Sequence, residues 1–153
     1  MAIFLVQHGK ALPKEASPDP PLSEEGKATV ERIAGVAMAS CVRPALIRHS
    51  GKTRARETAE IIASFLKPAG GVEVTRGMDP LDDVITFATG LTDKDPVMFV
   101  GHLPFMESLT AYLVTGSTGK RVVRFQNGGI VCLDRDPGQK DWYIRWTLMP
   151  EIG

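Results

Sequence analysis

The feature that most constrains this chain is the alternation of short, continuously apolar runs with longer segments of helical periodicity. Residues 2–6 read Ala-Ile-Phe-Leu-Val and residues 97–100 read Val-Met-Phe-Val. Runs of this kind are typical of strands that are buried on both faces of a parallel sheet. Such strands need helices on both sides, so the pattern predicts an α/β fold, a three-layer sandwich around a mostly parallel central sheet.

The other expected elements continue this alternation. Ser23 is a good N-cap, with Glu24 and Glu25 in the first turn of the helix that follows. The buried face of that helix is expected to hold Val30, Ile33, Ala34 and Ala37. We expect further strands at 45–47 and 72–75 and further helices at 53–66, at about 82–91 with Asp82 as a cap, and from Pro104 onward. The inner face of the 53–66 helix is expected to hold Ala55, Ala59, Ile62 and Leu66.

The C-terminal part of the chain has a different pattern. Short apolar runs at 122–125, 130–133 and 142–148 are separated by turn-prone residues at 127–129 and 136–138. This predicts mixed strands joined by turns at the C-terminal end of the sheet.

Length and charge indicate one domain that covers residues 1–153. The chain carries 18 Lys+Arg and 18 Asp+Glu, so a broad basic surface for nucleic acid is not expected. The apolar run at the N-terminus is too short for a membrane span or a signal segment. Cys41 and Cys132 match no zinc or redox spacing and are expected to be reduced core residues. Together these features predict a cytoplasmic protein without nucleic-acid or membrane partners.

The three histidines of the chain share one position relative to the predicted strands. His8, His49 and His102 each lie at the C-terminal end of a buried strand. In open α/β sheets ligands bind at that edge. A single histidine there is better explained by a structural hydrogen bond than by a function, but three at one edge indicate a functional site. Glycines that would let a ligand approach the backbone lie beside them, at positions Gly9, Gly51 and Gly101.

A basic cluster follows the second strand and points to an anion. Lys52, Arg54 and Arg56 crowd the start of the 53–66 helix, where the helix dipole disfavours cations. A solvated helix face is the alternative, since Arg56 and Glu60 are spaced to pair. A bound phosphate would explain the cluster better, because helix amides and arginine both suit it. Together with the histidines, this favours phosphate chemistry on a nucleophilic imidazole.

A metal site made of His8, His49 and His102 is the competing interpretation. The three histidines lack the short spacing of many such sites, and the basic residues nearby would repel a divalent cation. The sequence therefore predicts neither a metal nor an organic cofactor.

Four short motifs occur in an order that resembles the histidine phosphatase superfamily, which has a phosphoglycerate mutase-like fold. They are His8-Gly9-x-Ala11, Pro21-Leu22-Ser23-x-x-Gly26, Ser50-x-x-x-Arg54-Ala55-x-x-Thr58-Ala59 and Gly101-His102. The short length and the sequence GHLPFM are most similar to the SixA-like phosphohistidine phosphatases. The resemblance covers essentially the whole chain.

The resemblance implies a role for each matching residue. His8 would be the nucleophile that carries the phosphoryl group, and Arg54 would bind the phosphoryl oxygens. His102 would donate to the phosphoryl group and stabilise its charge, and Gly9 would fix the tautomer of His8 through its backbone. Gln7, His49, Ser50 and Lys52 are also expected to line the phosphate site. The implied substrate is a phosphorylated signalling or carrier protein, with a small phosphate ester as the alternative.

Gln7 departs from the family, which usually has arginine before the nucleophile. A neutral amide replaces a charged contact here, a deficit of about 1–2 kcal/mol, or roughly three- to thirty-fold in binding. Lys10, Arg48, His49 or Lys52 could supply the missing charge. A second alternative is therefore a catalytically weakened, phosphate-binding regulatory module, although the presence of both His8 and His102 argues against it.

The general acid is the least defined part of the predicted site. Superfamily members often use a carboxylate after the third strand, where this chain has Asp79, Asp82 and Asp83. A helix cap explains Asp82 equally well. An imidazole leaving group is a weaker base than an alkoxide, so a phosphohistidine phosphatase needs less of an acid. Asn127 faces either the pocket or a turn.

Overall fold

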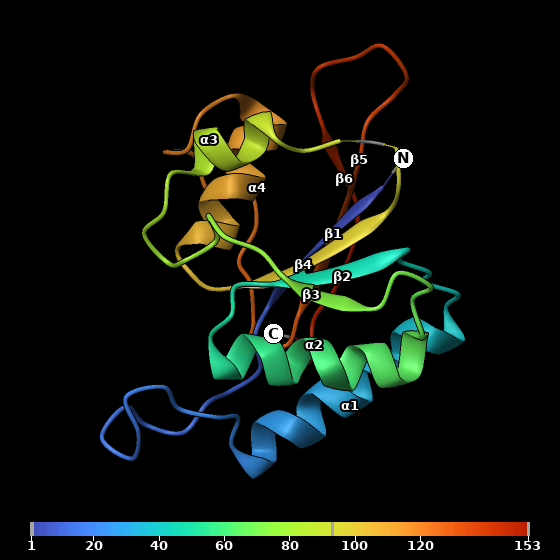
Figure 1. Cartoon of the computed structure of the whole chain (residues 1–153). Coiled ribbons are helices and arrows are strands. Elements are labelled where there is room, and N and C mark those ends of the chain that lie inside the picture. The colour runs from blue at the N-terminus through green and yellow to red at the C-terminus, as the bar shows by residue number, and fades with distance from the viewer. Residues whose placement is uncertain (1, 93, 153) are drawn as a thin grey trace.

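A six-stranded sheet with helices on both faces forms the centre of the computed structural model (Figure 1). The structure describes residues 2–92 and 94–152. The strands are β1 (Ile3–Gln7), β2 (Leu46–His49), β3 (Val72–Val74), β4 (Val97–Gly101), β5 (Ile130–Asp134) and β6 (Tyr143–Leu148). The helices are α1 (Glu24–Ala39), α2 (Thr53–Leu66), α3 (Val84–Thr89) and α4 (Phe105–Thr115). Within the described ranges, none of these helices has the length and apolar character needed to cross a membrane.

The strand order is β3-β2-β4-β1-β5-β6. Strands β1 to β4 pair in parallel, whereas β5 runs antiparallel to both of its neighbours. The predicted three-layer α/β sandwich with a mostly parallel sheet and mixed strands at the C-terminal end is therefore confirmed. This order brings the carboxyl ends of β1, β4 and β2 together at one edge.

Alternation along the strands divides the core between the two helical layers. Val6 packs in the cluster with α1 and α2, while Leu5 packs in the cluster with α3 and α4. The four residues predicted for the inner face of α1 are all buried, and Ser23 caps the helix by accepting a hydrogen bond from the Gly26 amide. On α2 the predicted face is confirmed except for Leu66, which is half-buried, and it also includes Thr58.

Two predicted local features are wrong. Residues 122–125 form no strand, because the Phe125 amide donates to the Glu107 carboxylate (2.9 Å) rather than to a sheet neighbour. The cap of α3 is Asp83, which accepts from the Ile85 amide (3.0 Å), and not Asp82. Asp82 instead accepts a hydrogen bond from the Asp79 amide (2.8 Å) in the preceding turn.

The two cysteines lie in different environments. Cys132 is buried in β5, and burial raises the pKa of its thiol to about 11. Cys41 is exposed in the left-handed turn that ends α1, with φ of 59°, so its assignment to the core is wrong. A turn that must leave the helix surface places this side chain in solvent.

Candidate active site

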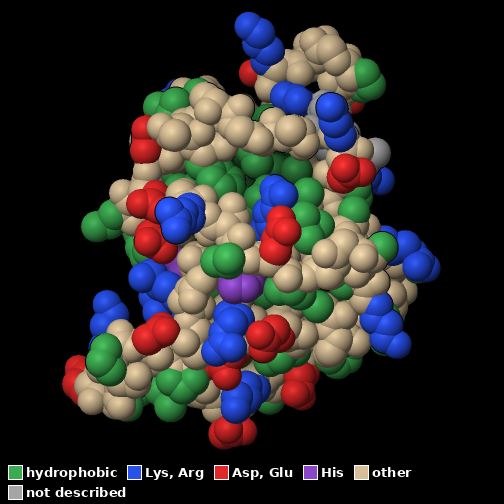
Figure 2. Space-filling view, viewed as in Figure 1, with side chains coloured by type: hydrophobic (Ala, Val, Ile, Leu, Met, Phe, Trp, Pro, Cys, Tyr) green, Lys and Arg blue, Asp and Glu red, His purple; other side chains and the backbone are tan. Residues whose placement is uncertain are grey.

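His8 and His102 lie side by side at the carboxyl edge of the sheet. Their strands are neighbours, and the register that pairs Gln7 with Gly101 brings the two following histidines together. The ring centroids are 5.0 Å apart, and the His8 amide donates to the Gly101 carbonyl (3.0 Å). Figure 2 shows histidine atoms reaching the surface near the centre of this face, with Lys and Arg side chains beside them.

The hydrogen bonds of His8 define which ring nitrogen carries the proton. Nδ1 lies 2.6 Å from the Gly9 carbonyl, which can only accept, so Nδ1 carries the proton. Nε2 is therefore unprotonated, and its lone pair accepts from the Nε–H of Arg54 at 3.3 Å. Burial lowers the pKa of His8 to about 4; the Gly9 hydrogen bond opposes the shift and Arg54 adds to it. His8 is thus a neutral imidazole at pH 7, with an unprotonated nitrogen beside a guanidinium.

Thr58 connects the loop after His8 to the helix that carries Arg54. Its Oγ1 accepts from the Gly9 amide (3.0 Å) and donates to the Arg54 carbonyl (2.8 Å). The side chain is completely buried on α2. The sequence predicts no role for Thr58, although it occurs in one of the motifs above. The sequence does contain a signal for such a contact, because Thr58 is a polar residue on the apolar face formed by Ala55, Ala59 and Ile62.

His102 is almost completely buried and has one occupied nitrogen. Its Nε2 lies 2.6 Å from Ser50 Oγ. Burial lowers the pKa of His102 to about 3, and electrostatic interactions with His8, Arg54 and Lys52 lower it further. Ser50 is therefore placed at this ring, and its Oγ also accepts from the backbone amide of Lys52 (3.4 Å).

Two buried polar atoms at this edge have no hydrogen-bond partner among the described residues. They are Nδ1 of His102 and Oε1 of Gln7. Strand alternation places the Gln7 side chain on the same face of the sheet as Leu5, toward α3 and α4. Since buried polar groups are normally satisfied, these atoms mark an edge where hydrogen bonding is incomplete.

The turn at 127–129 supports the backbone of Gln7 and His8. Asn127 Nδ2 donates to the His8 carbonyl (3.2 Å), and the Gly128 amide donates to the Gln7 carbonyl (2.9 Å). Of the two positions considered for Asn127, the turn is the one observed, with its amide anchoring the end of β1.

Among the described residues, the hydrogen bonds and ion pairs of His49 and Arg48 do not involve the histidine pair. His49 lies two residues after Ile47 on β2, so its side chain is on the same face of the sheet, toward α2. Its Nδ1 accepts from the Gly51 amide (3.1 Å). Burial lowers the pKa of His49, with Glu60 opposing and Arg56 adding to the shift. Arg48 pairs with Glu73 at 2.7 Å. Across residues 2–92 and 94–152, no group of three His, Cys, Asp or Glu side chains could hold a metal ion.

The glycines beside the histidines do not serve the predicted approach of a ligand. A Cβ on Gly9 would lie 2.7 Å from Val30 Cγ2, and one on Gly101 would lie 2.5 Å from Met106 Cε. These spaces are filled by α1 and α4, so both glycines are explained by helix packing. Gly51 has φ of 95°, which a turn into α2 requires.

The carboxylates considered as general acids are engaged elsewhere. Asp83 accepts from Ile85 and Thr86 at the start of α3; the Thr86 hydroxyl is the main cause of its lowered pKa. Asp82 and Asp83 line a cavity of about 530 Å³ with Phe87 and Phe99. In the described part of the chain, no hydrogen bond or ion pair joins either carboxylate to the histidine pair.

The comparison with family models gives one match. The model described as "Histidine phosphatase superfamily (branch 1)" matches residues 3–79, half of the chain. The matched segment contains His8 and Arg54 but ends before His102. No curated protein sequence matches this chain.

Solved structures share the whole fold. The structure of the protein histidine phosphatase SixA complexed with tungstate has a TM-score of 0.82 and 23% identity, over 98% of this chain and 97% of that one. The alpha-ribazole phosphatase from Shigella flexneri has a TM-score of 0.77 and 16% identity, over 100% and 98%. A mycobacterial glucosyl-3-phosphoglycerate phosphatase has a TM-score of 0.71 and 17% identity, over 94% and 96%. At these identities the likeness establishes the fold alone.

Proposed function

Because this chain belongs to the histidine phosphatase superfamily, we propose that it is a phosphatase that works through a covalent phosphoryl intermediate on His8. The observation that carries the proposal is the hydrogen bonding of His8. Its Nδ1 donates to the Gly9 carbonyl, and its unprotonated Nε2 accepts from the Arg54 Nε–H at 3.3 Å. This is the arrangement that a nucleophilic imidazole needs.

The chemistry divides into two displacements. His8 Nε2 attacks phosphorus in line with the leaving group, which departs with the electron pair of the broken bond and takes a proton from water. Arg54 and His102 hold the equatorial oxygens, where charge is concentrated in the transition state. Water then attacks the phosphohistidine, the nitrogen–phosphorus bond breaks, and neutral His8 and inorganic phosphate are restored.

Phosphohistidine on a signalling or carrier protein is the substrate class that this site suits best. Asp82 and Asp83 accept hydrogen bonds from backbone amides at and before the start of α3. A leaving imidazole needs less protonation than an alkoxide. A site whose two candidate acids make no hydrogen bond to the histidine pair in the described residues therefore favours a P–N over a P–O bond. The likeness to the SixA structure is consistent with this substrate.

A comparison of substrates tests the proposal. Phosphate release would be measured with a histidine-phosphorylated protein, phosphoserine and a sugar phosphate, with His8→Ala as the blank. We expect kcat/KM to be highest for the phosphohistidine substrate. Preference for an ester would identify a small-molecule phosphomonoesterase instead. Phosphate binding without turnover on any substrate would indicate the regulatory module that Gln7 suggested.

A further inference from the structure

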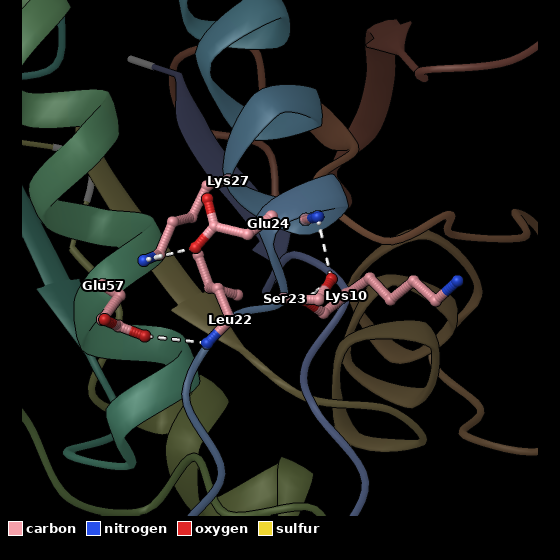
Figure 3. Close-up of polar contacts among 7 residues, drawn as sticks. Lys10, Leu22, Ser23, Glu24, Lys27 and Glu57 are labelled. Atoms are coloured by element: carbon pink, nitrogen blue, oxygen red, sulfur yellow. Dashed lines mark hydrogen bonds and ion pairs between the residues drawn. The ribbon is translucent and has the colours of Figure 1, made fainter.

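The segment between the nucleophile and α1 is a loop closed at its base. Ala11 and Leu22 form an antiparallel bridge, and the Leu12 amide donates to the Pro21 carbonyl (2.9 Å). The Lys10 carbonyl accepts from both the amide and the hydroxyl of Ser23. The Leu22 amide donates to the Glu57 carboxylate of α2 (2.8 Å), and Figure 3 shows this contact beside the Ser23–Lys10 contact.

The tip of this loop completes the N-terminus of α2. Lys52, the N-cap residue, makes no side-chain cap, and the first turn of α2 has no acidic residue. Asp19 takes that place from the loop. Its Oδ1 accepts from the Thr53 amide (3.1 Å) and its Oδ2 from the Thr53 hydroxyl (2.6 Å). The cap that a helix usually takes from the residue just before it is supplied here by a residue 34 positions before the first residue of α2.

The same contact ties Asp19 to the cations of the phosphate site. The pKa of Asp19 is lowered chiefly by the Thr53 hydroxyl and amide, with Arg54 and Lys52 contributing. These two cations also act on the pKa of His102, and Arg54 on that of His8. Asp19 is therefore an ionised carboxylate close to the positive charges that a phosphoryl group would meet.

We infer that Asp19 is a positioning residue that holds the first turn of α2 so that the Arg54 guanidinium faces His8 Nε2. The inference rests on the proposed function, because it takes the phosphate as the partner of Arg54. Asp19 has two opposed effects on an incoming phosphate. Its hydrogen bonds orient Arg54, which strengthens binding, and its negative charge weakens binding.

Two substitutions separate these effects. Asp19→Asn keeps an oxygen that accepts from Thr53 and removes the charge, so phosphate should bind at least as tightly as in the wild type. Asp19→Ala removes both. Because an N-cap contributes about 1 kcal/mol, we expect Asp19→Ala to bind phosphate about five-fold more weakly than Asp19→Asn.

The experiment measures the Kd of inorganic phosphate by calorimetry for both variants in two backgrounds. One background keeps Arg54. The other carries Arg54→Lys, which retains a cation but not the planar fork. The difference between the Asp19 variants should be about five-fold with Arg54 and below about two-fold with the lysine. Glu15→Gln, in the same loop, is the control and should leave the Kd of phosphate unchanged in both backgrounds.

The outcomes are distinct. Equal binding by the two Asp19 variants with Arg54 present, or the same ratio in both backgrounds, would overturn the inference, because a purely structural cap would not depend on residue 54. If Asp19→Ala proves unstable, Thr53→Val takes its place, because it removes the hydroxyl that donates to Asp19. This variant should weaken phosphate binding in the Arg54 background and much less in the Arg54→Lys background. Phosphate binding that follows this pattern without turnover would overturn the proposed function alone. A wild-type protein that does not bind phosphate would overturn both.

Discussion

The two helical layers contribute differently to the region around His8. The α1–α2 layer is joined to that region by polar contacts: Thr58 to Gly9, Arg54 to His8, and Glu57 to Leu22. The α3–α4 layer is dominated by packing of apolar side chains. Phe87 makes edge-to-face contacts with Phe99 (5.3 Å) and Phe105 (5.4 Å).

This difference assigns separate tasks to the two faces of one sheet. Apolar packing is non-directional, so the α3–α4 layer can stabilise β4 without orienting a particular atom of the site. Hydrogen bonds are directional, and the α1–α2 layer uses them to orient the His8 ring, the Gly9 amide and the Arg54 guanidinium. Substitutions in the first layer should therefore change stability, and substitutions in the second should change the reaction.

The largest effect is expected from His8→Ala. With the attacking nitrogen gone, turnover should be abolished. The wild type, quenched during turnover of a ³²P-labelled substrate, should carry an acid-labile, base-stable phosphoryl group that the variant lacks. His49→Ala is the matched control: it removes another strand-end histidine that faces α2, and labelling should persist. Undiminished label in His8→Ala would refute the assignment of the nucleophile.

The pH dependence of stability should be the next largest effect. Burial lowers the pKa of folded His8 to about 4, against about 6.5 for an unfolded histidine. Between these values the unfolded state binds the proton and the folded state does not, so stability falls as pH drops from 6.5 to 4 and then levels off. The contribution is on the order of 3 kcal/mol. Urea unfolding at pH 7 and 4.5 should show a smaller loss for His8→Ala than for the wild type, and equal losses would contradict the shift.

Two buried threonines offer a direct test of the difference between the layers. Thr58 of α2 and Thr110 of α4 are both completely buried, and each donates to the carbonyl four residues earlier. Thr58 also accepts from Gly9. Thr58→Val keeps the shape but leaves the buried Gly9 amide without its acceptor, a cost of about 1–3 kcal/mol. We expect kcat to fall with Thr58→Val and to stay unchanged with Thr110→Val. Similar kcat for both variants would mean that the polar tether does not orient the nucleophile.

The strand-end position of the histidines predicted the pairing of His8 with His102, because parallel neighbouring strands end at one edge. His49 ends the neighbouring strand β2 and faces the α1–α2 layer, but its observed hydrogen bond is to the Gly51 amide, a contact in the turn into α2 that strand position does not predict. The packing at the glycines is not predicted by strand position either: Val30 and Met106 come from helices distant in sequence, and their approach to Gly9 and Gly101 depends on helix packing.

Contacts between distant loops and helices were also beyond sequence reasoning. The Asp19–Thr53 contact spans 34 residues and depends on how the loop folds back. Local features are predicted correctly. The Ser23 cap joins two residues within one turn, and the apolar face of α1 depends only on spacing within one helix.

The smallest effect, and the one most informative about this chain, concerns Gln7. Its Oε1 is buried without a partner among the described residues, at the position where the family usually has arginine. Lys52 is the best placed of the cations considered as replacements, since its charge acts on His102. Arg48 and Lys10 are paired with Glu73 and Glu25.

If Lys52 supplies the missing charge, Gln7→Arg should change kcat/KM by only a few-fold, because the phosphate already has its cation. Lys52→Ala should lower kcat/KM by about ten-fold or more, the loss of one charge-assisted contact, and Gln7→Arg should restore part of it. Arg48→Ala is the control and should be neutral, because its partner lies on β3. A gain of ten-fold or more from Gln7→Arg alone would show that nothing compensates. Strict additivity in the Gln7–Lys52 double-mutant cycle, with neither gain nor rescue, would show that Gln7 does not approach the phosphate.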